Sequence, residues 1–158
     1  MLELSPIGII HSPYKGIEGM PIQAAGAAGV EGTVEVFEQY AAGLVDLDGF
    51  SHIILLYQFH QSSGYDLSVV PFLDDKPHGL FATRAPRRPN PVGLSIVRLN
   101  RVENGILHIS NVDILDETPL LDIKPYVPAF DQPGEVRSGW IEDVGESISD
   151  YSADNRFK

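Results

Sequence analysis

The chain has 158 residues, 43% of them hydrophobic and 21% charged, and a formal net charge of −11. These values are ordinary for one globular domain, which at this length buries about two-thirds of the surface of its unfolded chain. Cysteine is absent, which excludes disulfides, thiolate metal sites and a cysteine nucleophile. The negative charge repels nucleic acid and anionic membranes, so a polyanionic partner requires a local basic patch. Because no apolar run approaches the roughly 20 residues of a membrane span and no basic secretory leader is present, a cytoplasmic location without a membrane partner is expected.

The first half of the chain predicts a loop, two strands and one brief helix. Residues 19–32 are rich in Gly and Ala and favour a loop, and GTVEVFE (32–38) favours a strand. The segment EQYAAGLVDLDGF predicts a helix of about two turns that ends at Gly49. FSHIILLYQFH (50–60) is rich in β-branched and aromatic residues and predicts a central strand. Its alternation directs one apolar set toward the core: Ile53, Leu55, Tyr57 and Phe59.

The second half predicts further short strands. Residues 61–79 are interrupted by Gly and Pro and predict a long excursion with a short extended piece. Asn104-Gly105 lies between two apolar runs and predicts a hairpin within 92–115. Residues 118–128 alternate, and SGWIEDV near the C-terminus favours another strand. The alternation at 118–128 places Leu121, Ile123 and Val127 inward, and Asp122, Lys124 and Tyr126 on the opposite face. Several short strands with one or two short helices predict a mainly β fold, an antiparallel β-barrel or sandwich rather than a doubly wound α/β fold.

Familiar catalytic and cofactor motifs are missing. There is no G-x-G-x-x-G, no P-loop and no H-E-x-x-H, and neither Ser51 nor Ser95 lies in a complete G-x-S-x-G elbow. His52 and His60 share a strand face but are about 26 Å apart at ~3.3 Å per residue. No metal site is therefore expected.

A stiff basic loop is the most distinctive segment. In RAPRRPNPVGLS (84–95) three prolines hold the residues before them in extended conformations, so Arg84, Arg87 and Arg88 lose less entropy when an anion immobilises them. Arginine binds carboxylate and phosphate groups through two parallel hydrogen bonds. The alternative is that these arginines pair with the many surface acids.

Two further segments carry polar side chains where strands end. His60-Gln61 closes the strand at 50–60, where it either hydrogen-bonds a ligand or meets solvent. The segment 113–131 combines Asp113 and Asp116 with Asp122, Lys124 and Tyr126. Grouped carboxylates suggest acid–base chemistry or a metal, while a solvated face with a local Asp/Lys pair is the alternative.

Four blocks of the chain, taken in order, resemble the TrmO family, also called YaeB or TsaA-like. They are IGIIHSPY (7–14), DGFSHIILLYQFH (48–60), FATRAPRRPNPVGLS (81–95) and LDETPLLDIKPYVP (115–128). The resemblance runs from about Leu4 to Phe130. It implies a TrmO-like β-barrel domain over residues 1–130, with residues 131–158 as a C-terminal tail packed on or extending from that domain.

The resemblance also implies an activity. Members of the family are S-adenosylmethionine-dependent tRNA methyltransferases built on a single β-barrel of non-Rossmann type. They form homodimers, bind the cofactor near the dimer interface and methylate N6 of threonylcarbamoyl-adenosine at position 37. Two alternatives stay open: methylation of a small molecule or a protein, which the acidic surface favours, and cofactor binding without turnover. If tRNA is the substrate, a helper protein could recruit it to this acidic chain.

Carried onto this sequence, the resemblance assigns two sets of residues. The cofactor pocket falls on Pro21, Ile22, Gln23, His60, Gln61, Arg84, Leu94, Ile114, Leu115, Asp116 and Glu117, with Arg84 expected to meet the methionine carboxylate. The catalytic base is expected among Asp116, Asp122, Lys124 and Tyr126. This chain has Asp-Glu-Thr-Pro at 116–119 where the family has Asp-Gly-Thr-Pro, so a charged residue occupies a turn position that favours glycine.

Overall fold

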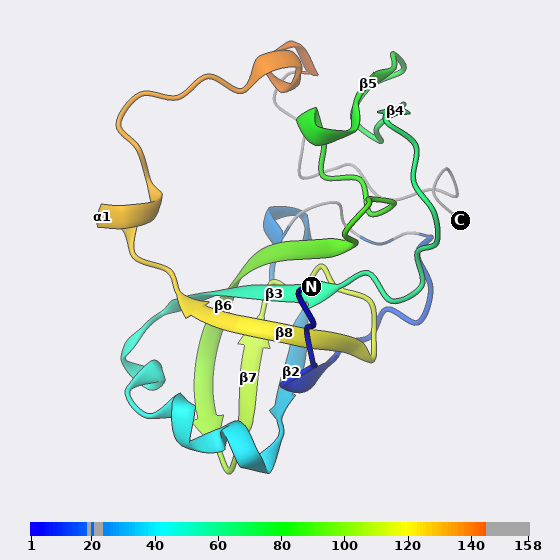
Figure 1. The fold of residues 1–158 in the computed structure, drawn as a ribbon. Helices are drawn as coiled ribbons and strands as arrows, with labels where there is room; N and C mark the ends of the chain where they lie inside the picture. The colour runs from blue at the N-terminus through cyan, green and yellow to red at the C-terminus, as the bar shows by residue number, and fades with distance from the viewer. Residues whose placement is uncertain (19, 21–23, 145–158) are drawn as a thin grey trace.

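The structure is a computed structural model that describes residues 1–18, 20 and 24–144. Six antiparallel strands form a closed barrel in the order β1-β2-β7-β6-β3-β8 (Figure 1). They are β1 (Gly8–His11), β2 (Glu31–Val36), β3 (His52–Gln58), β6 (Val92–Glu103), β7 (Ile106–Ser110) and β8 (Thr118–Pro125). The predicted mainly β fold is confirmed, and the barrel replaces the alternative of a sandwich.

Short elements connect and cover the barrel. The excursion predicted at 61–79 carries β4 (Ser68–Val69) and β5 (His78–Gly79), which pair beyond one end of the barrel (Figure 1). The helices are η1 (Ala24–Ala27), η2 (Glu38–Leu44), η3 (Leu47–Gly49), η4 (Leu80–Ala82), α1 (Pro128–Asp131) and η5 (Gly139–Val144). Within the described residues, no helix has the length and apolar character that crossing a membrane requires.

Two predicted elements differ from the structure. The helix predicted over 38–50 is two 3₁₀ helices, η2 and η3, separated by Asp46 in a left-handed conformation with φ of 70°. The predicted strand SGWIEDV is wrong, because this segment contains the 3₁₀ helix η5. It has no strand partner in the described part of the chain, and a strand without a partner leaves its backbone hydrogen bonds unmade.

The core lies inside the barrel and follows the period of two. The inward set of β3 is buried as predicted, with Ile53 and Leu55 at 0% exposure and Tyr57 at 6%. From the facing strands come the other fully buried aliphatic side chains, which include Ile10, Val34, Val97, Leu107 and Leu120. Burying each of these stabilises the fold by about 1.5–3 kcal/mol.

The predicted hairpin joins β6 to β7. Asn104 and Gly105 both have positive φ values, 52° and 78°, as the two-residue turn of a twisted hairpin requires. Glu103 pairs with Ile106 across this turn. The turn therefore sets the register of β6, the longest strand of the barrel.

β8 departs from the predicted alternation. Its pairing with β3 shifts between Leu56 and Tyr57, because Asp122 lies opposite Leu56 whereas Leu120 lies opposite Tyr57. The extra residue, Leu121, forms a bulge, and a bulge reverses the side on which later residues fall. Leu120 is consequently buried in the core, and the prediction that Leu121 points inward is wrong. Ile123 packs against the core as predicted.

Candidate functional site

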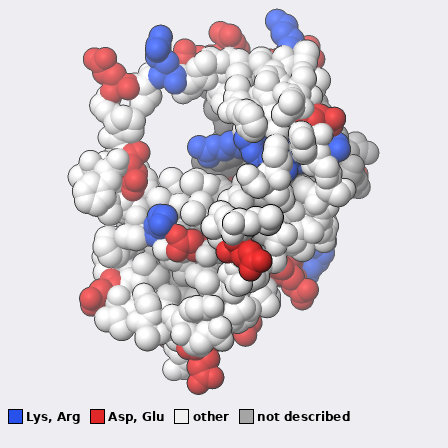
Figure 2. All heavy atoms as spheres, in the orientation of Figure 1, with Lys and Arg blue, Asp and Glu red and all other residues white. Residues whose placement is uncertain are grey.

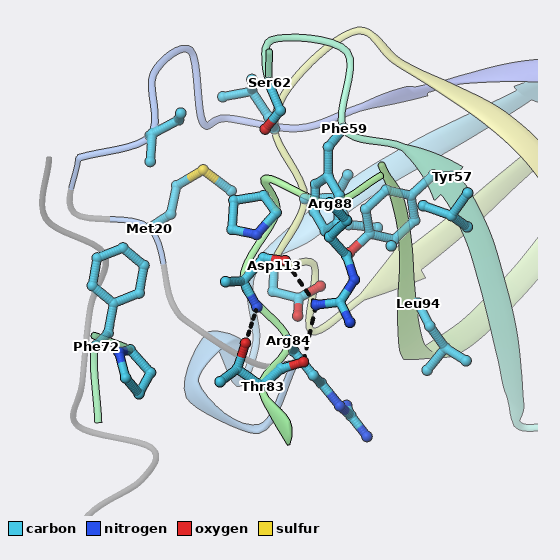
Figure 3. A pocket seen from close by; sticks show the side chains of 18 of the residues that line it. Met20, Tyr57, Phe59, Ser62, Phe72, Thr83, Arg84, Arg88, Leu94 and Asp113 are labelled. Atoms are coloured by element: carbon cyan, nitrogen blue, oxygen red, sulfur yellow. Dashed lines mark hydrogen bonds between the residues drawn. The ribbon is translucent and has the colours of Figure 1, made fainter. Parts of the chain in front are cut away.

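A cavity of about 750 Å³ lies where several chain segments meet at one end of the barrel. Its walls come from the end of β3, the loop around Arg84, the start of β6, the 113–118 turn and η5. Figure 3 shows several of these side chains, among them Tyr57, Leu94 and Asp113. The volume falls within the roughly 300–1,000 Å³ of small-molecule sites. Figure 2 shows the surface hollowed between the α1–η5 segment and the barrel, with Lys or Arg atoms at the edge.

The basic loop is braced by two of its own arginines. Arg88 donates hydrogen bonds from Nη1 to the carbonyl oxygens of Thr83 and Ala85, both at 3.0 Å. Arg87 donates to the carbonyl oxygen of Ser63 at 3.1 Å and forms an ion pair with Asp66 at 3.3 Å. The alternative of pairing with acids therefore holds for Arg87.

Arg84 acts electrostatically on two buried side chains of the cavity. It lines the cavity together with Arg88, whose hydrogen bonds to the loop backbone are drawn in Figure 3. Its positive charge lowers the pKa values of both Asp113 and Tyr57, against the larger opposite effect of burial. Arg84 thus acts on two cavity-lining side chains, whereas Arg88, which also lines the cavity, donates hydrogen bonds to backbone carbonyls of its own loop.

A buried hydrogen-bond chain runs from the barrel interior to the cavity wall. Ser95 donates from Oγ to Oδ1 of Asp113 at 2.6 Å, and its oxygen lies 2.8 Å from the hydroxyl of Tyr57. Because the single hydroxyl hydrogen of Ser95 goes to Asp113, Tyr57 donates to Ser95. Asp113 and Tyr57 both line the cavity, so the chain ends at the ligand space.

Burial perturbs both ends of this chain. Desolvation raises the pKa of Asp113 from its ordinary value of 3.8 to about 6, and the hydrogen bond from Ser95 and the charge of Arg84 offset only part of it. Desolvation, and then the charge of Asp113, also raise the pKa of Tyr57. Asp113 therefore changes charge near neutral pH, which an exposed carboxylate does not do.

Asp116 lies beside the cavity and holds the turn in place. Its Oδ1 accepts from the backbone N–H of Ser12 at 2.8 Å, its Oδ2 pairs with Lys15, and its own N–H donates to the carbonyl oxygen of Tyr14 at 2.8 Å. Desolvation raises the pKa of Asp116, but the hydrogen bonds from Lys15 and Ser12 and the nearby positive charges outweigh it, so the pKa is lowered overall. An ionised carboxylate that already has these partners is suited to fixing the turn.

The next residue of that turn is strained. Glu117 has a φ of 62°, in the left-handed region that glycine adopts without penalty. Thr118 then closes the turn by donating from Oγ1 to the carbonyl oxygen of Leu115 at 2.6 Å. The turn thus keeps a geometry that suits glycine although this chain carries glutamate.

The structure brings together six of the eleven predicted cofactor residues. Six of them line the cavity: His60, Gln61, Arg84, Leu94, Ile114 and Leu115. Asp116 and Glu117 belong to the adjoining turn and are not among the lining residues. Pro21, Ile22 and Gln23 lie outside the described residues. The assignment of these residues to a cofactor remains a prediction.

The predicted catalytic residues do not line the cavity. Asp122 and Lys124 form an exposed ion pair of 2.9 Å on the outer face of β8, and this pairing raises the pKa of Lys124. Tyr126 follows β8, with its ring edge-on to that of His52 at 6.5 Å between centroids. These three residues match the alternative of a solvated face with a local Asp/Lys pair.

Sequence reasoning missed several lining residues, including Trp140. Its indole Nε1 donates to the carbonyl oxygen of Ala82 at 2.8 Å, and its ring stacks on His78 with centroids 4.4 Å apart. His78 in turn pairs with Asp74 at 2.8 Å. Residues 139–141 are thereby attached to the cavity rim, although the SGWIEDV pattern itself pointed only to a strand. The division of the chain into a barrel domain over residues 1–130 and a C-terminal tail over residues 131–158 stays a prediction.

Comparisons with known proteins place the chain among its relatives. The tRNA-methyltransferase O N-terminal domain family matches residues 9–132. A Pyrococcus abyssi protein named "Probable S-adenosyl-L-methionine-binding protein" is 53% identical over 157 residues, covering 99% of this chain and 85% of that protein. The human "tRNA (adenine(37)-N6)-methyltransferase" is 31% identical over 157 residues, covering 95% of this chain and 34% of the human protein.

A solved structure shares the fold. The crystal structure of TrmO from Pseudomonas aeruginosa superimposes with a TM-score of 0.75 at 39% identity, covering 89% of this chain and 62% of the other. This chain therefore spans less than two-thirds of the length of that protein. Since the family match, the relatives and the barrel agree, the chain belongs to the TrmO family of tRNA methyltransferases.

Proposed function

We propose that this chain binds S-adenosylmethionine and methylates N6 of threonylcarbamoyl-adenosine at position 37 of tRNA. Membership in the TrmO family and the names of its relatives support methylation of a tRNA adenine. The observation that carries the proposal is the cavity at the barrel end, where an arginine and a buried aspartate face apolar walls. The threonylcarbamoyl group and the cytoplasmic location are the finer parts of the proposal.

The lining residues fit the chemistry of this cofactor. A guanidinium at Arg84 suits the methionine carboxylate, and apolar side chains such as Phe59, Phe72 and Leu94 suit the faces of adenine. His60 and Gln61 supply hydrogen-bonding groups at the same rim. The bound cofactor supplies an electrophilic methyl group, and the task of the protein is to align the acceptor nitrogen and exclude water.

Calorimetry with S-adenosylmethionine tests the binding site. Arg84→Ala should weaken affinity roughly ten- to hundredfold, because a hydrogen bond between charged groups contributes about 1.5–3 kcal/mol. The matched control is Arg101→Ala, which removes an exposed arginine paired with Glu103 outside the cavity and should leave affinity unchanged. Equal affinities for wild type and Arg84→Ala would contradict the assignment of Arg84.

The tRNA substrate is tested by profiling modified nucleosides. Purified protein and unmethylated tRNA should give N6-methylated threonylcarbamoyl-adenosine at position 37, and no such product would reject the substrate. Binding should also weaken steeply with salt, because contacts to phosphate release counterions. A small molecule or neutral protein substrate would lack this dependence. The net charge of −11 makes the salt measurement informative, since only a local basic surface can attract tRNA.

The homodimer is part of the same proposal. Val92, Leu94 and Ile96 project outward from β6 and are 38–43% exposed, forming an apolar stripe beside the cavity. Exposed apolar patches mark interaction sites, and Leu94 also lines the cavity, so dimerisation through this stripe would place the site at the interface. Sedimentation should give a dimer that Ile96→Glu converts to monomer. A wild-type monomer at micromolar concentration would refute this.

A second function, cofactor binding without turnover, is favoured by the names of several relatives. The Pyrococcus protein and one from Archaeoglobus fulgidus, 39% identical over 128 residues, are both named as S-adenosyl-L-methionine-binding proteins. Cofactor binding without release of S-adenosylhomocysteine in the presence of a complete tRNA pool, with or without cell extract to supply a helper protein, would support it. Turnover would exclude it.

A further inference from the structure

We propose that Asp113 is the base that accepts the proton from N6 of the adenosine during methyl transfer. This inference rests on the proposed function, and it replaces the four residues that the sequence suggested for the base. It is carried by the place of the Asp113 carboxylate in the cavity wall, at the end of the buried chain from Tyr57 through Ser95.

The hydrogen-bond chain holds the carboxylate in one orientation. Ser95 occupies one acceptor position of Oδ1 at 2.6 Å, and Tyr57 fixes the Ser95 hydroxyl from the other side. An ionised carboxylate has about four lone-pair positions, so Asp113 keeps acceptor capacity after binding Ser95. All three residues are buried, which prevents the carboxylate from turning toward bulk water.

Competing carboxylates are unsuitable for this task. Asp116 is committed to Lys15 and to the backbone of Ser12, and Asp122 is paired with Lys124 on the barrel exterior. Neither lines the cavity. Among the aspartates and glutamates of the described chain, Asp113 is the one that faces the ligand space.

The surroundings of Asp113 favour proton transfer near neutral pH. The charged and titratable groups that act on it or respond to it are Arg84 from the loop, Tyr57 from β3 and Tyr14 from the segment after β1. Arg88 and His60 line the same cavity. Desolvation raises its pKa to about 6, so at pH 7.5 it is mostly ionised and yet more basic than an exposed aspartate. A base with a pKa near the operating pH is the most effective.

The step balances without another reactant. The N6 nitrogen forms a bond to the methyl carbon while the bond between that carbon and sulfur breaks and leaves its electron pair on sulfur. The hydrogen on N6 leaves as a proton to the Asp113 carboxylate. Asp113 then releases the proton to water when the products depart, which restores the ionised form.

Asp113→Asn keeps the shape of the side chain and removes the base. Single-turnover methylation at saturating cofactor should slow by roughly 10²- to 10⁴-fold, the usual contribution of general base catalysis. The cofactor dissociation constant should stay within about threefold of wild type, because asparagine keeps the shape of the side chain and the proposed base acts on the acceptor nitrogen. A threefold change corresponds to about 0.7 kcal/mol. Asp48→Asn, at an exposed position of η3, is the matched control and should leave the rate unchanged.

The pH dependence separates a base from a residue that only supports the fold. The wild-type rate should fall as pH drops through about 6, where Asp113 becomes protonated, and Asp113→Asn should lack this limb. Ser95→Ala removes a hydrogen bond that lowers the pKa of Asp113, so the limb should move to higher pH. Ser95 is thereby tested as a positioning residue.

Carboxyl NMR of the free protein gives a readout that needs neither cofactor nor tRNA. One aspartate should titrate near 6 and its resonance should be missing from Asp113→Asn. Three results would overturn the inference: titration near 4, an Asp113→Asn rate within tenfold of wild type, or a cofactor affinity that falls as much as the rate does. If the wild type is active and any of these three results is found, only the inference about Asp113 is refuted. If the wild type binds no cofactor, the proposed function is refuted and the inference with it.

Discussion

Replacing Asp113 by asparagine should stabilise the protein above neutral pH, even though it removes the proposed base. The carboxyl group is buried, with a pKa raised from 3.8 to about 6, so the folded state binds the proton more tightly than the unfolded state does. Stability from this group is therefore fully present below pH 3.8 and is lost as pH rises through about 6. Asparagine stays neutral and avoids that loss.

The magnitude follows from the difference between the two pKa values. It corresponds to about 3 kcal/mol over the whole pH range, of which about 2 kcal/mol falls between about pH 4.5 and pH 8. Asparagine can still accept from Ser95 through its amide oxygen, but its NH2 group brings donors that the buried site must satisfy, which offsets roughly 1 kcal/mol at every pH. Asp113→Asn is thus expected to be close to wild type, or slightly less stable, near pH 4.5 and about 1–2 kcal/mol more stable near pH 8.

Urea unfolding of both proteins across this pH range measures the effect. Many carboxylates titrate in the same range, but the difference between variant and wild type isolates Asp113. Asp48→Asn should change stability by less than about 0.5 kcal/mol at all pH values, as surface substitutions usually do. If the difference between Asp113→Asn and wild type stays constant from about pH 4.5 to pH 8, the buried carboxylate does not have a raised pKa and the reasoning fails.

Three further substitutions probe the cavity wall and rim. Gly93→Ala places a Cβ 2.4 Å from a ring carbon of Tyr57, so overpacking should lower the free energy of unfolding in urea by about 1–3 kcal/mol. As a control, the Cβ of Gly43→Ala meets no atom within 4 Å, so this variant should not be destabilised by overpacking. Trp140→Ala removes the indole that closes the rim and should weaken cofactor binding about tenfold by calorimetry; an unchanged affinity would show that the rim does not cover the ligand. Glu117→Gly relieves the left-handed strain at φ of 62° and should raise the unfolding free energy by up to about 1 kcal/mol; a loss of stability would mean that the glutamate side chain contributes more than its backbone strain costs.

Strands whose signals are local were predicted well. The inward face of β3 follows from strict alternation, and the β6–β7 hairpin follows from an Asn-Gly pair that tolerates positive φ. The bulge at Leu121 was not predictable in this way, because it depends on how β8 pairs with β3 rather than on the residues of β8 alone. The 3₁₀ helix at Trp140 was missed for a related reason: its apolar residues cover the rim of a cavity formed by distant loops.

Predictions for the site likewise succeeded where the signal was local and failed where it depended on the fold. Residues carried by the family resemblance, such as His60 and Arg84, line the cavity because they lie in the segments that form its rim. Three of the four catalytic candidates, Asp122, Lys124 and Tyr126, were grouped by residue type and by sharing a strand face, and the exposed Asp122–Lys124 pair shows that this face is the outside of the barrel. Asp113 was visible in the sequence as one of several carboxylates, but nothing local distinguishes a buried aspartate from a solvated one.

What distinguishes Asp113 is the register between β3 and β6. Tyr57 pairs with Gly93 and Leu55 with Ser95, and the absence of a side chain at Gly93 lets the Tyr57 ring lie across that position, so its hydroxyl reaches Ser95. A slip of one residue would place a bulky side chain opposite Tyr57 and turn Ser95 to the outer face of the barrel. The hydrogen-bond chain, and with it the unusual basicity of Asp113, therefore arises from strand pairing around the barrel, which is why a search for motifs in the sequence finds the rim of this site but not its interior.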